Sequence, residues 1–99
     1  MKQKISYRRQ FDIKGRVAIV TGATGVLGKV FCAGLAEFGV KVAVVDLNEN
    51  DTTRYAKELQ ERYNVKCMGI SCDISNPESV KNMAFSVEET LGPVEILHN

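Results

Sequence analysis

The chain has 99 residues and a formal net charge of +1 at pH 7, and 44% of its residues are hydrophobic and 25% charged. This length suffices for one small domain of ordinary globular composition, and a nearly neutral charge gives no bulk attraction to nucleic acid. The sequence has no apolar run near the length of a membrane span and no signal-peptide core, so we expect a cytoplasmic protein that binds neither nucleic acid nor membranes.

Residues 1–10 form a polar arm with four basic side chains: Lys2, Lys4, Arg8 and Arg9. This arm is either solvated or a tail that binds a partner. Residues 11–99 form one predicted domain, in which Phe11 and Ile13 are expected to cover the lower end of a sheet. The three cysteines and the single histidine have no metal-ligand spacing, so we expect no metal site, and small buried thiols in a reducing compartment.

The most informative stretch is RVAIVTGATGVLG, which begins at Arg16. Val17–Val20 predicts a buried strand, an apolar pattern over Val26–Phe38 predicts a helix, and glycine recurs every third residue between them: Gly22, Gly25 and Gly28. Glycine allows a turn with positive φ and lets an anion approach without meeting a Cβ, while the first amides of a helix have no partners of their own. The stretch therefore predicts a phosphate site on backbone amides. The alternative is a tight strand–helix turn whose glycines serve packing alone.

The expected helix over residues 26–38 carries one apolar stripe at steps of four, four and three: Leu27, Phe31, Leu35 and Phe38. We expect this stripe to face the sheet, with Gly34 on the same side allowing a close approach. Gly39 ends the helix in the C′ position. Val40–Val45 predicts a second strand, and its nearly continuous apolar run indicates cover on both faces, as in parallel sheets.

Asp51 is the expected N-cap of a second helix, in which three core residues recur every four positions: Tyr55, Leu59 and Tyr63. Asn64 closes this helix, and a third strand is predicted over Val65–Cys72. Asn76 and Pro77 then begin a third helix, with proline in the first helical position.

The third helix has an apolar stripe of five residues: Val80, Met83, Ala84, Val87 and Leu91. Gly92 and Pro93 end it, and Val94–Leu97 begins a fourth strand. The resulting β-α-β-α-β-α-β order predicts an α/β fold, a doubly wound parallel sheet with strand order 3-2-1-4. Ligands of such sheets bind beside the carboxyl ends of strands 1 and 4, where the order reverses.

Three stretches carry a resemblance to a known family. Thr21–Gly28, with the sequence TGATGVLG, resembles the cofactor loop of the short-chain dehydrogenase/reductase family, and FDIKGRV before it resembles the start of typical members. The commonest family pattern, TGxxxGxG, has its middle glycine at the position of Val26, whereas the middle glycine of this chain is Gly25. The resulting TGxxGxxG spacing is more usual in the extended and atypical branches of the family, and it also occurs in members of ordinary length. Glu95–Asn99 resembles the start of the family's (D)ILxNNAG segment, so the resemblance covers only the cofactor half of the family's Rossmann fold.

Asp46 follows the second strand at the place where dinucleotide-binding proteins carry an acidic residue. Its carboxylate can accept both ribose hydroxyls of an adenosine; the alternative is an ordinary carboxylate in a strand-end turn. At about 4 Å it would repel a 2′-phosphate by roughly 4 kcal/mol at an effective dielectric of 20. No arginine or lysine lies near enough in sequence to offset this, so we expect NAD(H) rather than NADP(H).

Asp73 and Ile74 resemble the family's motif after strand 3, which frames the adenine; the alternative is an Asx turn feeding the next helix. The Thr24 hydroxyl can add a bond to the pyrophosphate held by the loop amides. The complete set of expected cofactor contacts is Gly22, Thr24, Gly25, Val26, Leu27, Gly28, Asp46, Leu47, Asp73, Ile74 and Asn99.

The family's chemistry uses a Ser, a Tyr and a Lys, the last two in YxxxK spacing, with an Asn in support. Four residues after the three tyrosines stand Phe11, Leu59 and Cys67, so we expect no catalytic residue in this chain. The resemblance implies the amino-terminal part of an NAD-dependent oxidoreductase of about 250 residues or more. Its substrate would be an alcohol/carbonyl pair, and the glycine spacing with the Val26–Gly28 ending resembles members that act on sugars or sugar acids. The complete protein would be a homodimer or homotetramer. The alternative is a naturally short, non-catalytic dinucleotide-binding or vestigial protein.

Overall fold

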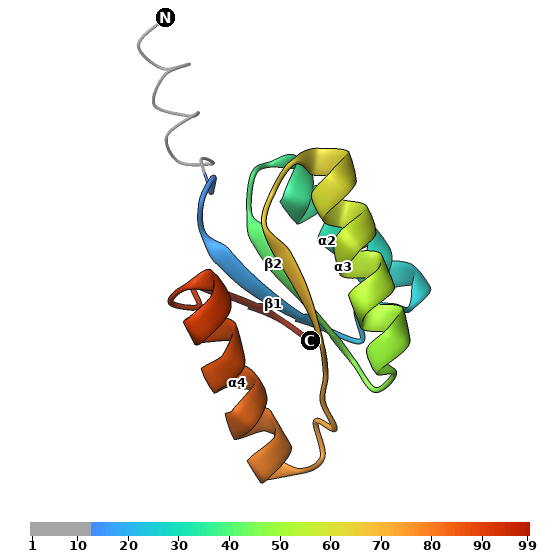
Figure 1. Ribbon diagram of the computed structural model, residues 1–99, viewed down its shortest axis with the longest axis vertical. Helices are drawn as coiled ribbons and strands as arrows, with labels where there is room; N and C mark the ends of the chain where they lie inside the picture. The colour runs from blue at the N-terminus through green and yellow to red at the C-terminus, as the bar shows by residue number, and fades with distance from the viewer. Residues whose placement is uncertain (1–12) are drawn as a thin grey trace, which may run out of the picture.

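The computed structural model describes residues 13–99, in which helices and strands alternate along the chain (Figure 1). In order, the elements are β1 (Val17–Thr21), α2 (Val26–Glu37), β2 (Lys41–Asp46), α3 (Glu49–Tyr63), β3 (Cys67–Ser71), α4 (Pro77–Leu91) and β4 (Ile96–His98). This order confirms the predicted β-α-β-α-β-α-β pattern, and the bounds differ from the predicted ones by one or two residues except at the start of α3, which lies three residues earlier. The predicted basic arm and Phe11 lie outside the described residues.

The strands form one parallel sheet with the order β3-β2-β1-β4, as predicted. The central strand β1 pairs with β2 from Val17↔Lys41 onward and with β4 through Ile19↔Leu97. In Figure 1, α2 and α3 cover one face of this sheet and α4 covers the other. Because all strands run in one direction, their carboxyl ends meet at the same edge of the sheet.

Each face of the sheet has its own hydrophobic core. Side chains alternate along a strand, so Ala18 and Val20 pack toward α2 and α3, whereas Val17 and Ile19 pack toward α4. Strand β2 divides its residues between the two cores in the same way, which confirms that its apolar run is covered on both faces. Ile13 packs against the core on the α2 and α3 side, as expected.

The predicted sheet-facing stripe of α2 is wrong. Leu27 is 83% exposed and Phe38 64% exposed, and of the four stripe residues Leu35 packs against the core. The buried residues of this helix are small: Gly28, Cys32 and Ala36. Because α2 is apolar on more than one side, periodicity alone identified a stripe but not the one that faces the sheet. Gly34 is not a contact point either, since a Cβ there would meet nothing within 4 Å.

The N-cap of α3 is Asn48 rather than the predicted Asp51. The Asn48 Oδ1 accepts a hydrogen bond from the Asp51 amide at 3.0 Å, which places Asp51 inside the first turn. Both residue types favour caps, and the helix begins at the earlier of the two. The predicted core residues of α3 are confirmed, with Tyr55 8% and Leu59 2% exposed and Tyr63 packed beside them.

The predicted ends of the other helices are confirmed. Asn76 caps α4 by accepting from the amides of Glu78 and Ser79, and Pro77 is the first helical residue. Gly39 follows α2 with φ +84°, and Asn64 ends α3 in the left-handed conformation. The predicted stripe of α4 faces the sheet, with Met83, Val87 and Leu91 buried.

Helix α3 lies unusually close to β3 because Gly69 has no side chain. A Cβ on Gly69 would lie 2.3 Å from the backbone carbon of Thr52. We predict that Gly69→Ala destabilises the fold by about 1–3 kcal/mol, since neither backbone can yield without moving α3 off the sheet. Urea unfolding followed by circular dichroism measures this change.

Gly34→Ala is the matched control for that substitution. It lies inside α2 in open space, so we expect it to stabilise the protein by about 0.5–1 kcal/mol through helix propensity. Equal unfolding midpoints for the two alanine variants would contradict the close α3–β3 contact.

Candidate functional site

The loop between β1 and α2 turns sharply at Gly22, whose φ is +63°. The loop is fixed to the neighbouring strand, because the buried Ala23 donates its amide to the Val45 carbonyl at 3.1 Å. Gly28 brings α2 against this turn: a Cβ there would lie 2.2 Å from the Gly22 carbonyl oxygen. On Gly22 itself a Cβ would meet nothing within 4 Å, so the outer side of the loop is open.

Helix α2 differs from the other described helices at its N-terminus. Its N-cap is Gly25, which provides no side-chain cap, and its first turn has no acidic residue. Helices α3 and α4 each have an asparagine cap and an acidic first turn. Within residues 13–99, the amides of Val26, Leu27 and Gly28 donate to no acceptor. Three free donors at the positive end of a helix dipole suit an anionic ligand such as a phosphate.

Asp46 ends β2 directly beside this loop. Its Oδ2 accepts from the Thr24 hydroxyl at 2.6 Å and from the Thr24 amide at 3.1 Å, while its Oδ1 accepts from the Leu47 amide at 2.8 Å. The Thr24 hydroxyl bond is the largest cause that lowers the pKa of Asp46; partial burial opposes it, and the two amide bonds add to it. The carboxylate is therefore ionised at neutral pH.

The Thr24 hydroxyl donates its proton in a hydrogen bond to the Asp46 carboxylate. In this arrangement the proton is not available for a pyrophosphate oxygen, which is the partner that the sequence suggested for it. The structure thus brings Thr24 and Asp46 together, 22 positions apart, as one unit at the rim of the glycine loop.

At the carboxyl end of β4, Asn99 lies beside the end of β1. The Thr21 hydroxyl lies 3.3 Å from the Asn99 Oδ1 and 3.4 Å from the His98 carbonyl oxygen, and can donate its one proton to either of them. The His98 ring stacks on Phe31 with 3.7 Å between centroids. Sequence reasoning missed this stack; the signal was the alternation along β4, which puts His98 on the face covered by α2.

Asp73 lies after β3 in an exposed turn that its own side chain stabilises. Its Oδ1 accepts from the Ser75 hydroxyl at 2.6 Å and from the Ser75 amide at 3.0 Å, and the hydroxyl bond is the main cause that lowers the Asp73 pKa. This is the turn that the alternative interpretation anticipated, and it leaves the expected adenine contact a prediction. Leu47 and Ile74, also expected contacts, are exposed by 71% and 66%.

Two cations lie near Thr24, although neither is close to Asp46 in sequence. Lys29 from α2 and Arg54 from α3 line a small hollow together with Thr24. The Lys29 ammonium lies 5.2 Å from the centre of the Tyr55 ring, and Arg54 pairs with Asp51 at 3.6 Å. Sequence reasoning missed both, because their approach depends on how α2 packs beside α3.

Within residues 13–99, no cluster of three or more His, Cys, Asp or Glu side chains could hold a metal ion. All three cysteines are free, and burial raises the pKa of the Cys32 thiol to about 12. No helix in this part of the chain has the length and hydrophobicity needed to cross a bilayer.

Residues 16–99 match the family model described as short chain dehydrogenase. The chain is 30% identical over 89 residues to 2-dehydro-3-deoxy-D-gluconate 5-dehydrogenase of Formosa agariphila, covering 90% of this chain and 34% of that protein. It is 32% identical over 97 residues to D-threitol dehydrogenase of Mycolicibacterium smegmatis, covering 98% of this chain and 37% of that protein. The chain therefore spans about a third of the length of these relatives.

Solved structures agree with this match. L-sorbose reductase from Gluconobacter frateurii, complexed with NADPH and L-sorbose, superposes with a TM-score of 0.81 at 28% identity over 86% of this chain and 32% of its own. A short chain dehydrogenase/reductase from Burkholderia phymatum, in complex with NAD, superposes with a TM-score of 0.81 at 30% identity. The match covers 88% of this chain and 31% of that one.

The depressed pKa of Asp46 predicts an acid-sensitive contribution to stability. A carboxyl whose pKa is lower in the folded than in the unfolded state stabilises the fold above its unfolded pKa, and this is lost as pH falls through the folded value. Asp46→Asn should therefore lower the free energy of unfolding at pH 6–7, and the difference from the unsubstituted protein should shrink below about pH 4. Urea unfolding at a series of pH values measures it.

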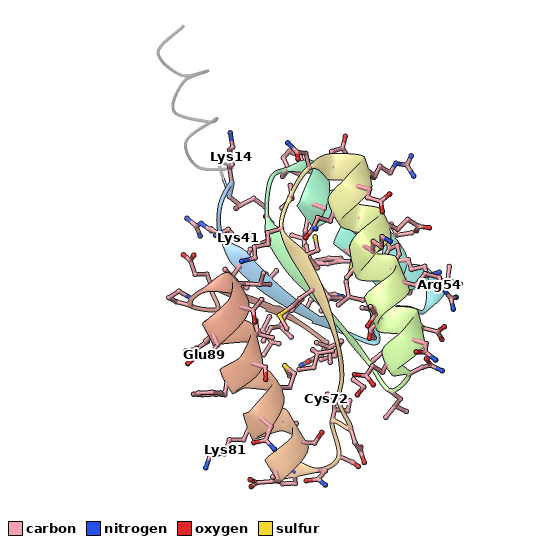
Figure 2. All side chains as sticks on the ribbon, viewed as in Figure 1. Lys14, Lys41, Arg54, Cys72, Lys81 and Glu89 are labelled. Carbon is pink, nitrogen blue, oxygen red and sulfur yellow. The ribbon has the colours of Figure 1, made fainter. Side chains whose placement is uncertain are left out.

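Glu89→Gln is the control for that series, since Glu89 is exposed on α4, on the opposite side of the molecule from Arg54 in α3 (Figure 2). A difference between Asp46→Asn and the unsubstituted protein that does not change with pH would contradict the role assigned to the ionised carboxylate.

Proposed function

We propose that this chain, which belongs to the short chain dehydrogenase family, is the dinucleotide-binding half of an NAD-dependent oxidoreductase. The complete protein would transfer hydride between the nicotinamide and an alcohol or carbonyl group. The observation that carries the proposal is the ionised Asp46 carboxylate, held by Thr24 at the rim of a loop whose helix has three free amides.

Those amides, on Val26, Leu27 and Gly28, would hold the pyrophosphate of the dinucleotide. The glycine loop fits this ligand because its outer side is open at Gly22, while Gly28 holds the helix start in place. When bound, the nicotinamide ring supplies the hydride donor or acceptor. Leu47, Ile74 and Asp73 would lie toward the adenine, and Asn99 toward the remainder of the cofactor.

We propose NAD as the preferred cofactor because Asp46 is a fixed negative charge where a 2′-phosphate would lie. Lys29 and Arg54 work against this preference, but each already has a partner, the Tyr55 ring and Asp51 respectively. Among the relatives, one solved structure is complexed with NADPH and another with NAD, so the family accommodates both.

The proposed substrate class is a polyol, a sugar or a sugar acid. The relatives named above include a D-threitol dehydrogenase, an L-sorbose reductase and a dehydrogenase of a deoxygluconate, and all match over most of this chain. The catalytic Ser, Tyr and Lys would lie in a part of the complete protein outside these 99 residues. A cytoplasmic homodimer or homotetramer is part of the same proposal, on family resemblance alone.

Cofactor affinity tests the proposal. We expect calorimetric titration of the complete protein to show tighter binding of NAD than of NADP. Asp46→Asn should narrow that ratio by about tenfold, since exposed like charges at close range repel by roughly 1–4 kcal/mol. Glu89→Gln, far from the site, should leave the ratio unchanged. Equal or tighter binding of NADP by the unsubstituted protein would rule out the proposed preference.

Turnover separates the proposal from a non-catalytic dinucleotide-binding protein. We expect the complete protein to reduce NAD in the presence of a polyol such as threitol or sorbitol. Tight NAD binding with no reduction of NAD by any member of a polyol and sugar-acid panel would favour the non-catalytic alternative.

A further inference from the structure

Helix α3 holds the first half of α2 through one tyrosine. The Tyr55 hydroxyl donates to the Lys29 carbonyl oxygen at 2.7 Å, and the Lys29 ammonium lies 5.2 Å from the centre of the same ring. Tyr55 is 8% exposed, and burial raises the pKa of its phenol to about 12, so the hydroxyl keeps its proton at neutral pH. Tyr55 therefore contacts both the backbone and the side chain of a single residue of α2.

The Lys29 carbonyl can accept this bond without losing its place in the helix. A backbone carbonyl has two lone pairs, and the Ala33 amide takes one of them through the regular i→i−4 bond of α2. The Tyr55 hydroxyl takes the other. The peptide group of the Lys29 carbonyl is thus polarised by two donors instead of one.

This peptide group is connected by hydrogen bonds to the start of the helix. Its N–H is the amide of Val30, which donates to the Val26 carbonyl within α2. The Val26 carbonyl in turn shares a peptide group with the amide of Leu27, one of the three free donors at the start of the helix. The bond from Tyr55 therefore lies at one end of a chain of hydrogen bonds, and a free amide lies at the other.

Hydrogen bonds in such a chain polarise one another, by about 10–30% per bond. The donor at one end thereby makes the free N–H at the other end a stronger donor. The chains that begin at the other two free amides, those of Val26 and Gly28, pass through different carbonyls. The effect of Tyr55 is therefore specific to the amide of Leu27.

We propose that Tyr55 is a positioning residue for the phosphate-binding end of α2, which it holds through Lys29 and in which it strengthens the Leu27 amide as a donor. The inference rests on the proposed function and takes the anion to be the pyrophosphate of the dinucleotide. Tyr55 acts through the helix and makes no contact of its own with the ligand.

Pieces of the cofactor test the proposal in the complete protein. Tyr55→Phe keeps the ring and removes the hydroxyl, and the probes are NAD, ADP and adenosine, of which adenosine has no phosphate. We expect the variant to bind NAD and ADP about twofold to fivefold more weakly, because the bond to an anion loses part of its strength. Its affinity for adenosine should be unchanged. Calorimetry measures the first two ligands, and NMR titration measures adenosine.

Tyr63→Phe is the matched control, since Tyr63 lies on the same helix and packs against the same core. Among residues 13–99 its hydroxyl donates to no acceptor, so this variant should bind all three ligands as the unsubstituted protein does. Equal weakening of all three ligands by Tyr55→Phe, or unchanged binding of ADP, would overturn the inference and leave the proposed function standing. Failure of the unsubstituted protein to bind NAD would overturn both.

A measurement without ligand separates the hydrogen-bond chain from a general loosening of α2. In the ligand-free complete protein, Tyr55→Phe should move the amide proton resonance of Leu27 upfield, and further than those of Val26 and Gly28. Tyr63→Phe should move none of the three. Equal shifts of all three resonances in Tyr55→Phe, or no shift of the Leu27 resonance, would overturn the inference.

Discussion

The site depends on one steric constraint, the contact of α2 with the end of β1 at Gly28. No side chain fits between this residue and the Gly22 carbonyl, where a Cβ would be 2.2 Å away. This contact sets where the helix begins and therefore where its three free amides lie. It also keeps the loop against β2, where the Ala23 amide donates to the Val45 carbonyl. Thr24 then meets Asp46 because both ends of the loop are fixed.

The site also depends on the parallel sheet, which brings residues that are far apart in the sequence to one edge. Thr21 and Asp46 end β1 and β2, Asn99 directly follows β4, and the order β2-β1-β4 brings the carboxyl ends of these strands together. The residues of β1 and β2 that precede Thr21 and Asp46 are apolar and buried on both faces of the sheet. The polar groups of the candidate site therefore lie on an apolar base, at the last strand residues and in the connections that follow them.

Local signals in the sequence were sufficient for the order of the elements and for most helix ends. Asn76 with Pro77, Gly39 and Asn64 act through the backbone of their own turn, so their roles can be predicted without the fold. The sheet-facing side of α2, the cap at Asn48, and the approach of Lys29 and Arg54 to Thr24 could not be predicted in this way. Each depends on which of two plausible local choices the tertiary packing selects. Thr24 and Asp46 could thus be named as candidates from the sequence, but the hydrogen bond between them could not, because a proton can be assigned to Thr24 only once Asp46 is seen beside it.

The small residues on the buried side of α2 also bear on how such a protein can change during evolution. Gly28, Cys32 and Ala36 are enclosed by the sheet, whereas Thr24 and Asp46 lie at its rim, half-buried. Larger side chains on the enclosed side would disturb packing against the sheet, whereas exchanges at the rim would leave the core intact and, under the proposed function, would alter ligand preference. Under the proposed function, selection could therefore change the cofactor that a descendant uses without first rebuilding the scaffold that holds it.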